Sequence, residues 1–163
     1  MRVEGSGEVY VVKGDIVRNL DTADSRLIER DLHEWKENDV ATARVVAGDK
    51  SRDVVRGSAE GKKFWADPEA PGASDETVSN WMTKLDRLRP NEYALTPPEG
   101  TESVVRVEYA AGSKSMGFLE LVKVTPAEGK PDYYILSERI RFHAKVAASL
   151  AEQVEQDLAS VVR

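Results

Sequence analysis

The stretch that decides the fold is residues 62–89, which read KKFWADPEAPGASDETVSNWMTKLDRLR. Residues 62–66 have the composition of a strand and are closed by Asp67-Pro68. The second half carries apolar side chains at helical spacing, at Val78, Trp81, Met82, Leu85 and Leu88. The stretch therefore predicts a strand that leads, through a loop rich in proline and glycine, into an amphipathic helix.

Both ends of this helix are marked in the sequence. Ser74, Asp75 and Glu76 supply a capping oxygen and acidic groups for the exposed N–H groups of the first turn. Two arginines follow near the carbonyl end, and Pro90 lacks the N–H that continuation of the helix would need. We therefore expect the helix to end at Arg89.

Strands are predicted on both sides of the helix. Before it, short connections join three strands, at residues 40–46, 51–56 and 63–66. After it, a Pro/Gly-rich break precedes four more, at residues 104–109, 116–124, 133–136 and 140–146. A last helix is predicted from Ala148, with one apolar face made of Leu150, Val154, Leu158 and Val161.

These runs predict an α+β fold, with antiparallel sheets and helices packed on them, built from repeated strand-strand-strand-helix units. Residues 8–95 are expected to hold the first unit and the tail of a preceding repeat, and residues 101–163 a second unit that shares the core. That tail consists of a strand at 8–13 and a short helix at 16–20, whereas 1–7 read as a disordered start or a cloning remnant. Residues 26–35 fit a helix and a strand equally well.

Composition excludes several classes of protein. The 163 residues carry a net charge of -6, with 40% hydrophobic and 32% charged residues, which indicates a globular chain and argues against nucleic-acid binding. The chain has no cysteine, which excludes disulfides, thiolate nucleophiles and Cys-ligated zinc. No apolar run reaches the roughly 20 residues that span a bilayer, which predicts a soluble chain. No catalytic or cofactor-binding motif is present, so no cofactor is expected.

Basic residues recur at alternate positions near the C-terminus, at Arg139, Arg141, His143 and Lys145. On a strand, these side chains would form one cationic face opposite Ile140, Phe142, Ala144 and Val146. Such a face would suit an acidic partner, an anionic glycan or a lipid headgroup. The alternative is a solvated face whose charges pair with carboxylates of a neighbouring strand, such as Glu108 or Glu120.

Two further sets of residues are candidates. Glu29, Asp31 and His33 would converge on an extended segment and offer ligands to a divalent metal, whereas a helix would scatter them. No recognised ligand spacing accompanies them, and a polar surface strand is the alternative. Two tryptophans, Trp65 and Trp81, are expected in the core. Trp35 lies among charged neighbours and is expected to be half exposed, as an anchor for a partner.

Much of the chain resembles the family catalogued as domain of unknown function 4340. The resemblance is carried by residues 8–12, 15–17, 27–32, 39–40, 63–65 and 77–88, and then by 119–121, 133–136 and the closing strand and helix. Its motifs are apolar patterns rather than catalytic signatures. Proteins of this family typically carry an N-terminal membrane anchor, project outside the cytoplasm and are often encoded beside gliding-motility-type or other ABC transporter components.

The resemblance implies an extracytoplasmic location in the periplasm or cell envelope. Any membrane association would depend on an anchor that these 163 residues do not contain. We expect a noncatalytic accessory or interaction module whose partner is a transporter subunit, an envelope polymer or another copy of the chain. The alternative is a metal-dependent hydrolase that acts on an envelope substrate, and only Glu29, Asp31 and His33 motivate it.

Overall fold

The structure is a computed structural model of the chain, and it describes residues 28–94 and 96–162. The strand predicted at 8–13, the helix predicted at 16–20 and the first seven residues lie outside the described residues. None of the described helices is long and apolar enough to cross a membrane.

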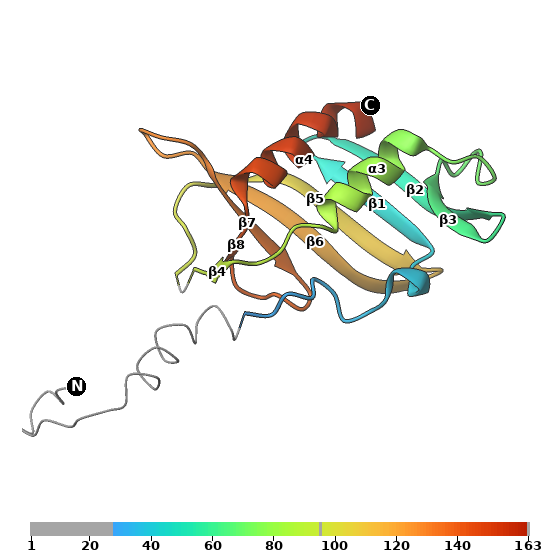
Figure 1. The fold of residues 1–163 in the computed structure, drawn as a ribbon, viewed down its shortest axis with the longest axis horizontal. Coiled ribbons are helices and arrows are strands. Elements are labelled where there is room, and N and C mark those ends of the chain that lie inside the picture. Colours follow the sequence, from blue (N-terminus) through green and yellow to red (C-terminus); the bar gives the residue numbers. More distant parts are fainter. Residues whose placement is uncertain (1–27, 95, 163) are drawn as a thin grey trace, which may run out of the picture.

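Eight antiparallel strands form one sheet in the order β3-β2-β1-β5-β6-β7-β8-β4 (Figure 1). The strands are β1 (Thr42–Ala47), β2 (Lys50–Ala59), β3 (Lys62–Ala66), β4 (Glu92–Tyr93), β5 (Thr101–Ala111), β6 (Lys114–Val124), β7 (Asp132–Ser137) and β8 (Ala144–Lys145). The described helices are α3 (Glu76–Leu85), α4 (Ala148–Val161) and the short 3-10 helix η1 (Glu37–Asp39). The predicted α+β class and most of the predicted strands are confirmed, while β4 was not predicted.

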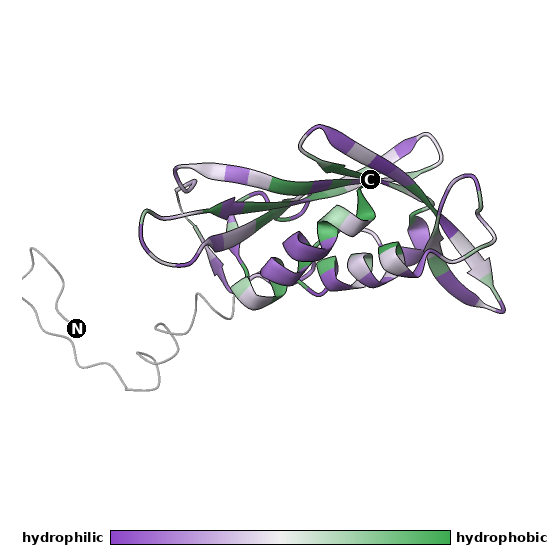
Figure 2. Ribbon diagram, turned by 90° about the horizontal axis from the view of Figure 1, so that it is seen from above, coloured by the Kyte–Doolittle hydropathy of each residue, from purple (hydrophilic) through white to green (hydrophobic). Residues whose placement is uncertain are grey.

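Helices α3 and α4 lie side by side on one face of the sheet (Figures 1 and 2). Strand residues that point to the helices are fully buried, including Val45, Val54, Val107, Leu121 and Ile135. The alternate residues point to the open face, where Arg106 pairs with Glu108 at 3.2 Å and with Glu120 at 3.1 Å. The two carboxylates therefore pair within β5 and β6 and not with the basic run at 139–145.

Helix α3 begins where it was predicted to begin and ends four residues earlier than predicted. Of the three predicted residues Ser74, Asp75 and Glu76, Asp75 is the N-cap, and its carboxylate accepts a hydrogen bond from the Val78 N–H at 3.0 Å. The helix ends at Leu85, because the N–H groups of Arg87 and Leu88 bond to carbonyls three residues back and tighten the chain into a turn. Leu88 is still buried in the core, so the apolar stripe is correct although the helix is shorter.

Two side chains fasten the helices to each other and to the sheet. The Trp81 indole N–H of α3 donates to the carbonyl of Val154 in α4 at 2.9 Å. Arg52 of β2 donates to the Val161 carbonyl at the end of α4 at 3.2 Å and to the Asp75 carboxylate at the start of α3 at 2.7 Å. Both Trp81 and Trp65 are buried, as predicted, whereas Trp35 is half-buried.

Two segments depart from the predicted pattern. Residues 28–36 are neither helix nor strand, so the described part of the ambiguous segment takes neither of the two predicted forms. The strand predicted at 140–146 is reduced to β8 (Ala144–Lys145). Ser137 ends β7 in a turn, because its N–H donates to the Ile140 carbonyl and its hydroxyl accepts from the Ile140 N–H. The predicted cationic strand face is therefore not formed.

The Trp81 hydrogen bond gives a test of helix packing. We expect Trp81→Phe to lower the free energy of unfolding by about 2 kcal/mol, because it removes a buried hydrogen bond and leaves a small cavity. Trp35→Phe is the matched control, and we expect it to cost less than about 1 kcal/mol, because the Trp35 ring N–H has no hydrogen-bond partner in the described part of the chain. Urea denaturation of the three proteins measures the difference, and equal losses would contradict this role of Trp81.

Candidate functional site

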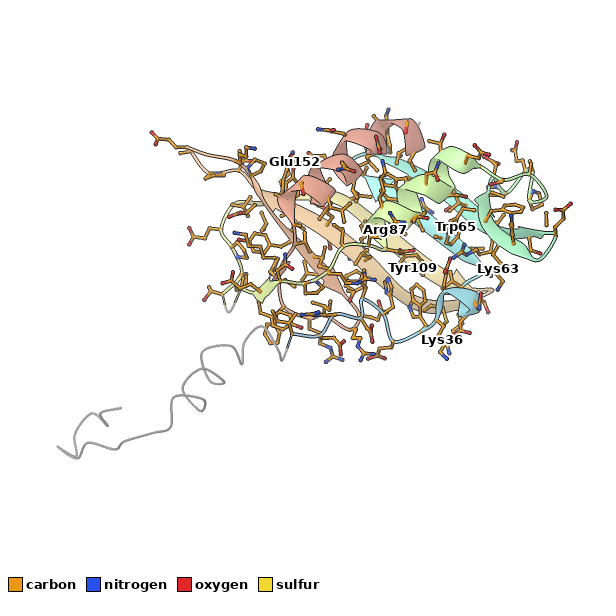
Figure 3. All side chains as sticks on the ribbon, viewed as in Figure 1. Lys36, Lys63, Trp65, Arg87, Tyr109 and Glu152 are labelled. Atoms are coloured by element: carbon orange, nitrogen blue, oxygen red, sulfur yellow. The ribbon has the colours of Figure 1, made fainter. Side chains whose placement is uncertain are left out.

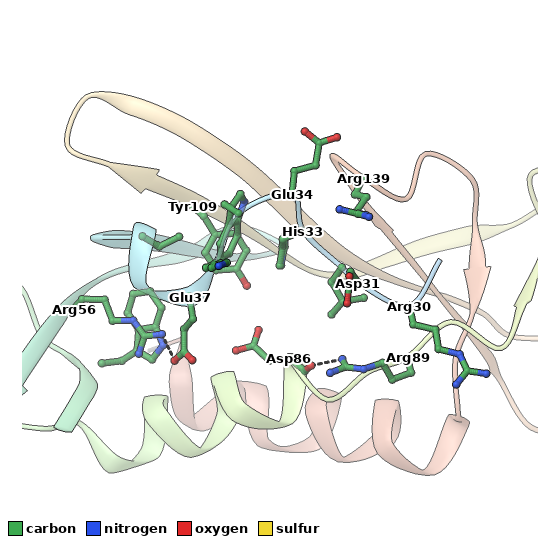
Figure 4. Close-up of a pocket in the computed structure, with 15 residues that line it drawn as sticks. Arg30, Asp31, His33, Glu34, Glu37, Arg56, Asp86, Arg89, Tyr109 and Arg139 are labelled. Atoms are coloured by element: carbon green, nitrogen blue, oxygen red, sulfur yellow. Dashed lines mark hydrogen bonds and ion pairs between the residues drawn. The ribbon is translucent and has the colours of Figure 1, made fainter. Parts of the chain in front are cut away.

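The main candidate site is a cavity of about 450 Å³ on the helix-covered face of the sheet. Residues 30–37 form one wall, the end of α3 at Asp86 another, and Arg56, Trp65 and Tyr109 of the sheet the floor (Figures 3 and 4). Register places these three floor residues on the helix face, since Arg56 is opposite Trp65 and Tyr109 is opposite the buried Ala43. We call this cavity the α3 pocket.

Glu138, in the turn after β7, holds the irregular wall in place. One of its carboxylate oxygens accepts from His33 Nδ1 at 3.0 Å and from the Glu34 N–H at 3.3 Å. The other oxygen accepts from the Phe118 N–H of β6 at 3.0 Å. Glu138 thus ties the wall to the sheet. Leu32 and Val40 anchor the same segment in the core.

Aromatic rings line the centre of the α3 pocket. The rings of His33 and Trp35 stack with centroids 4.0 Å apart, and Tyr109 lies across both, 5.0 Å from His33 and 4.7 Å from Trp35. On the other side, the Arg56 guanidinium lies 4.2 Å from the centroid of the Trp65 ring. The pocket therefore combines flat apolar surfaces with polar groups.

Four buried polar atoms of this pocket have no hydrogen-bond partner among residues 28–94 and 96–162: His33 Nε2, Trp35 Nε1, Arg56 Nε and Tyr109 Oη. The side chains of His33 and Arg56 are only 9% and 10% exposed, and Tyr109 is 3% exposed. Burying an unpaired donor or acceptor costs on the order of 1–3 kcal/mol. The four residues that carry these atoms all line this one cavity, which makes it the main candidate for a ligand site in the described part of the chain.

Charges around the pocket nearly balance. Five basic side chains line it: Arg30, Lys36, Arg56, Arg89 and Arg139. Four acidic side chains line it: Asp31, Glu34, Glu37 and Asp86. Two of these basic groups are already engaged, because Arg56 forms an ion pair with Glu37 and Arg139 forms one with Glu29 at 2.7 Å. The pocket has no strong net charge.

Burial shifts the titration of three pocket residues. Burial and, as a smaller cause, the nearby Glu37 carboxylate together raise the pKa of the Asp86 carboxyl to about 6, against the opposing effect of Arg56 and Arg89. Burial also raises the pKa of Tyr109 well above 10.0. It lowers the pKa of His33 below 6.5, although the Glu138 carboxylate opposes that decrease. At neutral pH, therefore, Tyr109 keeps its proton and the His33 ring is neutral.

The residues predicted as a metal site do not converge. Glu29 accepts from Arg139 and from the Asp31 N–H, and His33 Nδ1 binds Glu138. Among the described residues no group of three His, Asp or Glu side chains is arranged to hold a metal ion. The interpretation of Glu29, Asp31 and His33 as a cluster therefore fails, although Asp31 and His33 line the pocket.

The basic run is divided among different surroundings. Arg139 pairs with Glu29, and Lys145 pairs with Asp132 at 2.8 Å. His143 packs edge-on to Tyr134 with ring centroids 6.4 Å apart. Arg141 is exposed beside Phe142, which is 64% exposed. What remains of the predicted docking face is a small exposed loop.

No protein-family model, curated protein or solved structure matches this chain. The family resemblance described from the sequence therefore stays a prediction. The function has to be inferred from the geometry of the α3 pocket and from the chemistry of its lining.

Asp86 gives a test through pH. The pKa of this carboxyl is 3.8 for an ordinary aspartate and about 6 in the folded chain, so folding opposes its ionisation. Below about pH 4 the group is protonated in both states and costs nothing, and above about pH 6 the full cost of about 3 kcal/mol applies. We expect Asp86→Asn to raise the free energy of unfolding near pH 8 and to change it little below about pH 4.

Asp53→Asn is the matched control for this prediction, because Asp53 lies exposed on the open face of the sheet. Denaturant unfolding of each variant at the two pH values measures the effect. A gain from Asp86→Asn that does not depend on pH would contradict the burial of an ionised Asp86.

Gly117 gives a test of the pocket wall. It has φ +142°, and a Cβ atom there would overlap the Glu138 carboxyl group. We expect Gly117→Ala to displace Glu138 and to increase amide hydrogen exchange of residues 29–36 by about tenfold, which corresponds to about 1.4 kcal/mol. Gly112→Ala is the control, because Gly112 also has a positive φ, of +62°, but has open space around it. Equal exchange of the wall in both variants would contradict the role of Glu138.

Proposed function

We propose that this chain is a noncatalytic binding module of an ABC-transporter or cell-envelope system outside the cytoplasm, and that the α3 pocket is its ligand site. The observation that carries the binding function is the set of four unpartnered polar atoms in one aromatic cavity of about 450 Å³. Ligand pockets of roughly this volume are typically apolar, with a few convergent polar groups. A ligand that enters the pocket would supply the hydrogen bonds that the chain leaves unmade.

The composition of the lining favours binding over catalysis. His33 and Glu138 form a pair that resembles a general base with its orienting carboxylate. However, the described lining of the pocket offers such a base no serine or threonine nucleophile, and the described residues form no ligand set for a metal that would activate water. Because the predicted metal cluster is also not formed, the hydrolase alternative loses the residues that motivated it.

The assignment to an envelope or transporter system rests on the family resemblance. We propose that the chain contacts a protein partner through the exposed loop that carries Arg141, Phe142 and His143. The partner would be a transporter subunit or a second copy of the chain. Exposed aromatic and arginine side chains are the residue types that dominate binding energy at protein interfaces. This loop follows Glu138, so the partner surface and the pocket wall share one turn of the chain.

We also propose that the fold repeats a strand-strand-strand-helix unit, with the first unit and the tail of a preceding repeat in residues 8–95 and the second unit in residues 101–163. In its support, β1 to β3 precede α3 and β5 to β7 precede α4, and β1 pairs with β5 at the centre of the sheet. The two runs of strands then extend outward in opposite directions. The short strands β8, from the second unit, and β4, from the end of the first, extend the sheet beyond β7 and lie outside the repeated pattern.

Affinity capture from native membranes tests the proposed association. We expect the 163-residue chain to enrich ABC-transporter subunits or envelope proteins, and Arg141→Glu combined with Phe142→Ser to reduce that enrichment about tenfold, equivalent to 1.4 kcal/mol. Lys63→Glu is the charge-matched control, because Lys63 is exposed on the edge strand β3, far along the sheet (Figure 3). Mass spectrometry identifies the captured proteins. Equal capture by all three baits would remove the loop from the interface, and no capture by any bait would contradict the assignment.

A further inference from the structure

Among the described residues, those that line the α3 pocket carry a mixed set of unpartnered hydrogen-bonding groups, which are buried beneath its surface. The ring N–H of Trp35 and the Nε–H of Arg56 can only donate. The Tyr109 hydroxyl both donates and accepts. The fourth group is fixed by Glu138: because a carboxylate only accepts, the His33 proton is on Nδ1, and the Nε2 atom of the neutral ring is an acceptor.

This set discriminates between ligand classes. A carboxylate or phosphate offers acceptors only, and it would face the lone pair of His33 Nε2 and the carboxyl of Asp86. An ammonium group offers donors only, and it would face the N–H groups of Trp35 and Arg56. A hydroxyl group offers both, so a ligand with several neighbouring hydroxyls matches donors and acceptors together.

The near balance of charge around the pocket also favours a neutral ligand that carries hydroxyl groups. A strongly charged ligand is normally recognised by an excess of the opposite charge. Here Arg56 is already paired with Glu37, and Arg139 with Glu29. A neutral ligand leaves these pairs intact.

The aromatic walls determine the shape of the ligand. His33 and Trp35 stack with their planes within 19° of each other, and Tyr109 closes the cluster at 58° to Trp35. Flat rings of this kind pack against the C–H faces of a saturated ring, while the polar groups at their edges bond to its substituents. The cavity of about 450 Å³ accommodates one or two six-membered sugar rings.

We infer that the α3 pocket binds a neutral saccharide unit, with its hydroxyls bonded to Trp35, Arg56, Tyr109 and His33 and its ring packed on the aromatic cluster. This inference rests on the proposed binding function and specifies its ligand. The sugar is either a free saccharide or one unit of a glycan, because both present the same ring and hydroxyls.

A matched series of sugars tests the inference. The 163-residue chain, labelled with nitrogen-15, is titrated with glucose, mannose, galactose and N-acetylglucosamine, and with two charged counterparts of glucose, glucuronate and glucosamine. Soluble dextran provides the polymeric form of glucose. We expect at least one neutral sugar to shift the Trp35 indole signal and the amides of the pocket wall, and to bind more tightly than the charged sugars.

Two variants remove pocket groups without removing a hydrogen bond of the described chain: Tyr109→Phe and Trp35→Phe. We expect each to weaken binding about tenfold, equivalent to 1.4 kcal/mol. Tyr134→Phe makes the same chemical change on the open face of the sheet, and we expect it to leave the affinity unchanged. Thermal unfolding confirms that all three variants are folded.

The possible outcomes distinguish a failure of the saccharide inference from a failure of the proposed binding function. Binding of a monosaccharide, or of dextran alone, supports the inference and identifies a free or a polymeric ligand, respectively. Tighter binding of glucuronate or glucosamine than of every neutral sugar overturns it. If no sugar binds but members of a general fragment library shift the pocket signals, the saccharide inference fails and the proposed binding module stands. If neither sugars nor fragments shift these signals, both fail.

Discussion

The apolar face of the sheet is wider than the area that α3 and α4 cover, and the rest of the structure depends on how the remaining area is covered. Eight strands present a broad apolar face, and α3 and α4 cover part of it (Figure 1). Some of the remaining face is covered by residues 28–36, which are neither helix nor strand. An irregular segment over a sheet must find partners for its backbone groups. Glu138 and the Tyr93 hydroxyl supply them, and the α3 pocket lies where this cover meets the end of α3.

Two arginines of β2 show how structural and binding roles differ within one strand. Arg52 and Arg56 lie on the same face, four residues apart. Arg52 donates to Val161, Asp67 and Asp75, and holds the ends of both helices. Arg56 pairs with Glu37 and stacks on Trp65, yet its Nε–H makes no hydrogen bond in the described chain. The described hydrogen bonds of Arg52 hold the fold together, whereas Arg56 lines the pocket and has a buried donor without a partner in the described chain.

Periodicity was enough to predict most strands and both helices, because alternation and helical spacing are local properties of the chain. It failed at residues 140–146, where alternation continues although the hydroxyl of Ser137 turns the chain. It also failed at the end of α3, where Leu88 keeps the apolar spacing after the helix has ended. In both places the side chains keep the apolar spacing of the predicted element, although the backbone no longer has the conformation of that strand or helix.

The pocket was only partly predictable. Trp35 and His33 were candidates from the sequence, but as a partner anchor and a metal ligand. Glu138 is separated from His33 by 105 residues, and no local spacing connects them. Asp86 and Tyr109 looked like an ordinary helix-end carboxylate and an ordinary strand tyrosine. Their importance depends on burial in a shared cavity, which only tertiary packing produces.

The bond from the Arg52 guanidinium to the Val161 carbonyl joins two residues that are 109 positions apart in the sequence. Val161 and Val162 are themselves part of the buried core. During synthesis from the N-terminus, the helix face of the sheet cannot close until these residues have left the ribosome. This face is therefore completed only after α4 has been synthesised, and loss of Val161 and Val162 would loosen the start of α3 as well as the end of α4.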